Sequence, residues 1–67
     1  MVTQERIAEL QALGYMVEDV GAEYGSDFAG QYRWLNGRHE GDGFGNIEYS
    51  IEDVWAAADR YEKRNGC

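Results

Sequence analysis

A chain of 67 residues is long enough for one domain, over residues 1–67, but it buries only about 60% of the surface that its unfolded form exposes. Its formal charge of −7, from thirteen acids and six bases, disfavours direct binding of DNA, RNA or anionic lipid, because their phosphates would be repelled. A single cysteine, Cys67, excludes an internal disulfide and predicts a reducing, cytoplasmic setting.

The first predicted element is a short amphipathic helix over residues 4–13. Thr3 is a suitable N-cap, and apolar side chains recur at near-helical spacing from Ile7 to Leu13. Gly14 can adopt the left-handed conformation that ends many helices. A helix of this length is not stable alone, so it must pack on another element.

Residues 15–20 predict a strand, in which Tyr15 and Val17 share one face. The polar stretch 21–30 that follows is punctuated by glycines. Its composition is compatible with two structures, a wide hairpin loop or an extension of the strand towards Tyr24.

The clearest strand pattern covers residues 31–35, where Tyr32 and Trp34 share a face. The Asn-Gly pair at 36–37 predicts a tight turn after this strand. Residues 47–49 are a candidate for a third short strand.

A second helix is predicted after Ser50, which stands in capping-box spacing with Asp53. Its apolar face consists of Ile51, Val54, Trp55, Ala58 and Tyr61. The order of elements predicts an α+β fold, αββ(β)α, in which an N-terminal and a C-terminal helix cover one face of a small antiparallel sheet of two to three strands. Trp34 and Trp55 are expected to meet in its core.

The sequence contains no recognisable catalytic set. His39 is the only histidine, and no second histidine or nearby cysteine stands with it as a zinc site requires. The spacing of acids from Glu40 partly matches an EF-hand calcium loop, but Phe44 and Ile51 occupy two positions where that loop needs ligands. We therefore expect binding rather than catalysis, without a metal or a cofactor.

The acids are concentrated in two segments without a base, residues 18–27 and 40–53, which flank the clearest predicted strand. If these segments lie at neighbouring edges of the sheet, their acids form one anionic surface that can hold a partner protein with a basic groove, anchored by aromatic side chains. The predicted partner-binding residues are Glu18, Asp19, Glu23, Tyr24, Asp27, Phe28, Glu40, Asp42 and Phe44. The alternative is that the acids only keep a small domain soluble.

A family resemblance covers Phe28 to Ala58. This part contains the aromatic stretch QYRW at 31–34, a glycine turn, a Gly/Asp loop and the stretch YSIEDVWAAA at 49–58. It resembles small acidic proteins of phages and mobile elements in proteobacteria, a group that includes many anti-CRISPR inhibitors. The resemblance implies binding to a CRISPR effector complex, often by blocking a basic nucleic-acid channel, and it marks no individual functional residue.

Two functions are compatible with these features. The first is a protein-binding inhibitor that offers its acids to a basic surface, as a partial nucleic-acid mimic. The second is a small structural or adaptor phage protein that acts through self-association, so both a monomer and a homodimer are open. Neither function involves a membrane, because no apolar run is long enough to span one.

Overall fold

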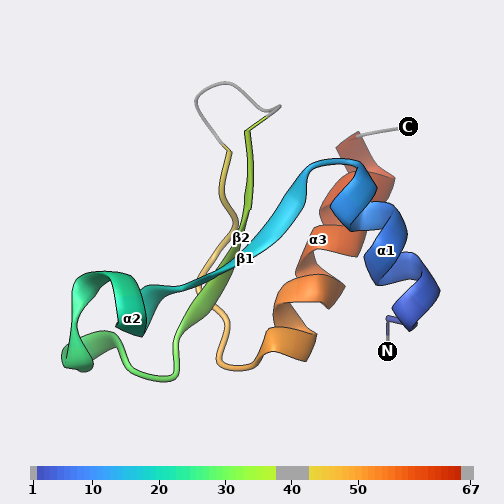
Figure 1. Ribbon diagram of the computed structural model, residues 1–67. Coiled ribbons are helices and arrows are strands. Elements are labelled where there is room, and N and C mark those ends of the chain that lie inside the picture. The colour runs from blue at the N-terminus through green and yellow to red at the C-terminus, as the bar shows by residue number, and fades with distance from the viewer. Residues whose placement is uncertain (1, 38–42, 66–67) are drawn as a thin grey trace.

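The computed structural model describes residues 2–37 and 43–65 of the chain. Its elements are α1 (Gln4–Ala12), β1 (Tyr15–Asp19), α2 (Val20–Tyr24), the 3-10 helix η1 (Ser26–Phe28), β2 (Tyr32–Asn36) and α3 (Ile51–Asn65). The two strands pair antiparallel, α1 and α3 lie together on one side of them, and α2 projects at the other end of the molecule (Figure 1). The predicted α+β fold, with a small antiparallel sheet between an N-terminal and a C-terminal helix, is confirmed.

Both long helices begin at the predicted caps. The Thr3 hydroxyl accepts a hydrogen bond from the Arg6 N–H at 3.1 Å, and the Ser50 hydroxyl accepts one from the Asp53 N–H at 3.1 Å. Each bond satisfies a backbone donor that has no partner inside its helix. The first helix ends as predicted before Gly14, whose φ of 100° is in the left-handed region that favours glycine.

The register of β1 and β2 determines which side chains face the helices. Tyr15 lies opposite Asn36, and Val17 lies opposite Trp34. Because strand side chains alternate between faces, these four residues point towards α1 and α3, whereas Met16, Glu18, Arg33 and Leu35 point to the outer face. The predicted placement of Tyr15 with Val17, and of Trp34 on the helix-covered side, is confirmed.

The core is a single cluster between the sheet and the two long helices. Its buried members are Leu10, Tyr15, Trp34, Val54, Trp55 and Ala58. Trp34 and Trp55 belong to the same cluster, as predicted. The Trp34 ring contacts Tyr15 edge-on at a centroid distance of 5.2 Å and Tyr61 at 4.8 Å, which are favourable separations for aromatic pairs.

The segment after the hairpin runs along β2 without forming a continuous strand in the described residues. It pairs at two isolated positions, Tyr32 with Glu48 and Leu35 with Phe44. Between these pairs the segment has one residue more than β2, which is the geometry of a β-bulge. The predicted third strand at 47–49 is therefore reduced to a bulged edge segment.

The tight turn predicted at residues 36–37 is wrong, because a two-residue turn does not fit the observed pairing of the chain. Asn36 is a buried residue of β2, and its side-chain amide donates a hydrogen bond to the Leu13 carbonyl at 3.2 Å. The Asn36 N–H donates to the Gly43 carbonyl at 2.7 Å, so the two chain segments meet at these residues rather than across a two-residue turn. The side-chain amide of Asn36 binds the carbonyl at the end of α1, and a local turn pattern in the sequence does not reveal this distant contact.

The segment after β1 joins β1 to β2 as a wide hairpin connection, which was one of the two predictions, but part of it is helical; the alternative of a strand extended towards Tyr24 is wrong. The Asp19 carboxylate accepts a hydrogen bond from the Ala22 N–H at 3.1 Å and thereby caps α2. A Cβ atom at Gly21 would lie only 2.7 Å from the Ala29 Cα, so glycine allows the chain to fold back closely after η1. The Asp19 cap and the close approach at Gly21 therefore allow this stretch to form two short helices, α2 and η1.

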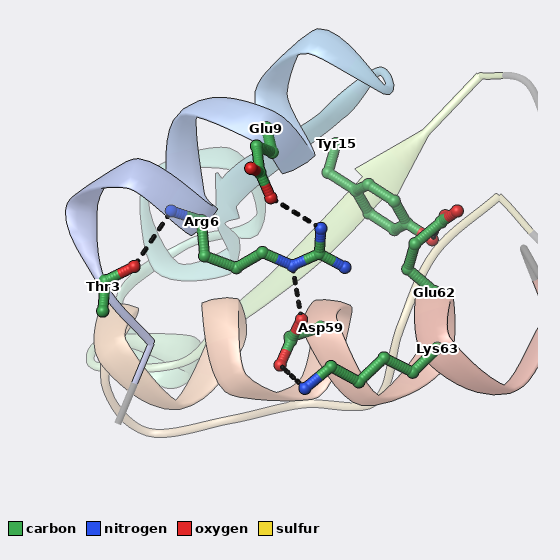
Figure 2. Close-up of polar contacts among 7 residues, drawn as sticks. All are labelled: Thr3, Arg6, Glu9, Tyr15, Asp59, Glu62 and Lys63. Atoms are coloured by element: carbon green, nitrogen blue, oxygen red, sulfur yellow. Dashed lines mark hydrogen bonds and ion pairs between the residues drawn. The ribbon is translucent and has the colours of Figure 1, made fainter.

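A polar network joins α1 to α3 (Figure 2). The Arg6 Nε donates to the Asp59 carboxylate at 2.6 Å, and a second Arg6 nitrogen donates to Glu9 at 2.8 Å. Lys63 contacts the other Asp59 oxygen at 3.1 Å. The hydrogen bond from Arg6 has the largest effect and lowers the pKa of the Asp59 carboxyl below its usual value. Burial opposes this shift, and the hydrogen bond and charge of Lys63 lower the pKa further.

Acid is expected to weaken this link between the helices. A carboxyl group whose pKa is lowered by folding stabilises the protein above its unfolded-state pKa, and the contribution is lost as the pH falls through the folded-state value. Between about pH 5 and pH 3, the melting temperature of the unmodified chain should therefore fall more than that of Asp59→Asn. Circular dichroism melts at several pH values measure this, with Asp27→Asn as an exposed control; parallel curves for unmodified chain and Asp59→Asn would contradict the assignment.

Candidate partner-binding surface

Arg33 lies on the outer face of the sheet. It stands directly opposite Glu18 in the strand register, and its Nε donates a hydrogen bond to the Glu18 carboxylate. The side chain of Glu18 is only 16% exposed. The charge of this predicted site residue is therefore largely neutralised within the protein.

Two aromatic rings lie beside the Arg33 guanidinium. The ring centroid of Tyr24 is 5.8 Å from the guanidinium carbon, and that of Phe44 is 5.0 Å from it, both within cation–π range. The Tyr24 hydroxyl also accepts a hydrogen bond from Arg33 at 3.2 Å. Glu18, Tyr24, Arg33 and Phe44 are called the Arg33 platform below.

The Arg33 platform connects the two acidic segments of the sequence. Tyr24 belongs to the first segment and Phe44 to the second, and both rings contact one guanidinium. Their outer surfaces remain open to solvent, with Tyr24 57% and Phe44 53% exposed. The structure thus brings together three of the predicted site residues, Glu18, Tyr24 and Phe44.

The region from Val20 to Phe28, called the acidic arm below, contains two further predicted acids. Glu23 lies on α2 and Asp27 on η1, and both are exposed. Within the described part of the chain neither carboxylate takes part in an ion pair. The acidic arm also exposes the ring of Phe28, so it presents two carboxylates together with an apolar side chain.

The remaining predicted residues have different roles or positions. The Asp19 carboxylate is exposed, but it is occupied by the cap of α2. Glu40 and Asp42 lie outside the described residues. Of the nine predicted residues, the structure therefore leaves Glu23 and Asp27 as the described acids without an internal partner.

Sequence reasoning missed two members of this surface. Arg33 was not among the predicted site residues, although its pairing with Glu18 follows once the strand register is known. Met16 is 59% exposed, and the register places it beside Leu35, which in turn pairs with Phe44. Met16, Leu35 and Phe44 thus form a row of apolar side chains on the outer face, which shares Phe44 with the Arg33 platform.

Two further properties concern only residues 2–37 and 43–65. No group of three or more His, Cys, Asp or Glu side chains there is placed to hold a metal ion. No helix in the same residues has the length and apolar character needed to cross a membrane.

The chain was also compared with known proteins. No model of a protein family matches it. Neither the curated proteins nor the solved structures contain a significant match.

Proposed function

We propose that the chain is an acidic protein-binding inhibitor that docks on a basic surface of a partner through its acidic arm and Arg33 platform. The observation that supports this most is the convergence of Tyr24 and Phe44, one from each acidic segment, on Arg33. Tyr24 belongs to the same acidic arm as the exposed acids Glu23 and Asp27. More specifically, we propose that the chain is encoded by a phage or mobile element and acts in the cytoplasm of a bacterial host. There it would block the nucleic-acid-binding surface of a CRISPR-Cas complex.

The physical basis is a rigid aromatic anchor within a charged rim. Arg33 is held by Glu18 and by both rings, so the exposed surfaces of Tyr24 and Phe44 are positioned before a partner arrives. Preorganised aromatic side chains lose little conformational entropy on binding and are frequent interface hot spots. Glu23 and Asp27 then supply the charge that attracts a basic partner and increases the association rate.

Charge reversal of the acidic arm tests the proposal. The double variant Glu23→Lys/Asp27→Lys should weaken binding to the partner at least ~100-fold, because two attractive contacts become repulsive ones. Glu5→Lys/Glu52→Lys is the matched control, since it makes the same change in net charge at exposed positions on the two long helices. The control should retain binding within about threefold at physiological salt, where distant surface charges are screened.

The assay is nucleic-acid binding by a panel of purified CRISPR effector complexes, measured by fluorescence anisotropy with and without the chain. Inhibition of one complex, lost in the acidic-arm variant and weakened by salt, supports the proposal. If no complex in the panel is inhibited, the CRISPR assignment is wrong. If the acidic-arm variant inhibits as well as the unmodified chain, the proposed surface is wrong.

A second candidate function is self-association through the apolar row of Met16, Leu35 and Phe44 on the outer face. It would make the chain a structural or adaptor protein, with the outer faces of two sheets packed together. Sedimentation equilibrium distinguishes the two functions. A dimer that dissociates in Met16→Lys favours self-association, and a monomer at about millimolar concentration excludes it.

A further inference from the structure

A cleft of about 540 Å³ lies between α3 and the segment that runs along β2. Its volume is in the range of small-molecule sites, which is about 300–1,000 Å³. Its lining includes Arg60 and Arg64 from α3, Asn46 and Glu48 from the edge segment, and aromatic rings. The cleft shares only Phe44 with the surface proposed above. Binding of a ligand in the cleft does not depend on the proposed inhibitor function.

The two arginines are unusual among the bases of this acidic protein. Arg6 and Lys63 contact Asp59, and Arg33 contacts Glu18. In residues 2–37 and 43–65, by contrast, neither Arg60 nor Arg64 forms an ion pair. They are four residues apart on one helix, so their side chains emerge as neighbours, about 5–6 Å apart at Cβ.

Two adjacent guanidinium groups without acidic partners are suited to bind one oxyanion. Their planar arrays of N–H donors match the oxygen atoms of a phosphate or a carboxylate. Arg60 and Arg64 are both exposed at the cleft, so a small anion reaches them without rearrangement of the fold. The net charge of −7 repels long polyanions, whereas a mononucleotide brings only about two negative charges to this pair.

The rest of the lining favours a planar ring beside the anion. The rings of Tyr61 and Phe44 line the cleft and are called the aromatic wall below; Phe44 is 53% exposed. Trp34 also borders the cleft, but it is buried and contacts Tyr61 at a centroid distance of 4.8 Å, so it supports the wall rather than offering a stacking face. Aromatic surfaces of this kind stack on nucleobases irrespective of sequence. Asn46 can both donate and accept hydrogen bonds, and Glu48 can accept them from an amino group.

We propose that this cleft binds a nucleoside monophosphate, with the phosphate on Arg60 and Arg64 and the base against the aromatic wall. Asn46 and Glu48 then face the polar edge of the base or the ribose. This is a binding site, and no chemical step is assigned to it. The affinity of the site depends on the attraction of Arg60 and Arg64 for the phosphate and on stacking of the base against the aromatic wall. Each of these two contributions can be tested separately.

The experiment is a titration of the isotope-labelled protein with AMP, followed by NMR. Trp34 lines the cleft, whereas Trp55 lines a separate groove with Val2 and Ile7, so the two indole N–H signals provide a site probe and an internal control. We expect a saturable shift of the Trp34 signal and none of the Trp55 signal. The absence of a saturable Trp34 shift up to about 10 mM AMP, a very weak affinity, would overturn the proposal.

Variants and partial ligands test the two halves of the site. Arg60→Gln and Arg64→Gln should each weaken AMP binding at least ~10-fold, as expected for loss of a charged hydrogen bond to phosphate. Lys63→Gln removes the same charge from the same helix but lies outside the cleft, so its effect should stay within about twofold. All three positions are exposed, and preserved amide spectra check that the variants fold.

Adenosine and inorganic phosphate should each bind more weakly than AMP. Phosphate that binds as tightly as AMP overturns the base contact. Adenosine that binds as tightly as AMP, or equal losses in Lys63→Gln and the arginine variants, overturns the phosphate site. These results do not depend on the inhibitor function, because the acidic-arm variant Glu23→Lys/Asp27→Lys retains the whole cleft and should bind AMP normally.

Discussion

Replacing Gly45 with alanine is expected to destabilise the protein by about 2–3 kcal/mol. A Cβ atom at this position would lie 2.2 Å from Nε1 of Trp34 and 2.6 Å from two carbons of the same ring. Trp34 is buried among the core residues, so its ring cannot move aside without displacing Tyr15 and Tyr61. The edge segment must therefore separate from β2, which weakens the Gly45 N–H hydrogen bond to the Trp34 carbonyl.

Gly37→Ala is the matched control for this experiment. A Cβ atom at Gly37 has no heavy atom within 4 Å, and the residue does not have a positive φ. Its stability should change by less than about 0.5 kcal/mol. Urea denaturation followed by tryptophan fluorescence measures both variants, and equal midpoints for Gly45→Ala and the unmodified chain would show that the edge segment does not pack on Trp34.

Leu10→Ala is expected to have an effect of similar or greater size, about 2.7–5 kcal/mol. Leu10 is the buried residue of α1, and truncation leaves a cavity beside the core that α3 and the sheet cannot fill without moving. A loss of this size is a large part of the total stability of a small domain, which is commonly about 5–15 kcal/mol. The variant should be largely unfolded at low urea concentration.

Met16→Ala provides the comparison, because it shortens an apolar side chain that is more than half exposed. It should cost less than about 1 kcal/mol. If Leu10→Ala does not fold at all, Leu10→Val keeps the test quantitative, with an expected loss of about 1 kcal/mol. Equal losses in Leu10→Ala and Met16→Ala would contradict the assignment of the core to the helix-covered face.

The features that were predictable from the sequence are local ones. The caps Thr3 and Ser50 and the terminator Gly14 each act within about four residues, so their chemistry is visible in a short stretch of chain. The helix-covered face was predictable for the same reason, because side chains alternate along a strand wherever it pairs. These features are sufficient to determine the α+β class.

The features that were missed depend on contacts between distant parts of the chain. The helical turns after β1 require Gly21 to approach Ala29, and the burial of Asn36 requires the end of α1 beside it. The bulge in the edge segment shifts its pairing with β2 by one residue, which no local pattern reports.

The candidate surface has the same limitation. Tyr24 and Phe44 were identified as exposed aromatics, but their common contact, Arg33, was visible only after the strand register was known. Arg60 and Arg64, the two arginines of the cleft, were not among the predicted site residues. Their lack of acidic partners is a property of the folded arrangement.

The link between α1 and α3 also determines when the chain can fold. Arg6 and Asp59 are 53 residues apart in sequence, and Tyr15 and Glu62, which share a hydrogen bond, are 47 residues apart. During synthesis, α1 and the hairpin therefore emerge before the helix that covers their apolar side chains. The core closes only when α3 has also emerged, so the ordering of the early elements must wait for the closure of a long loop.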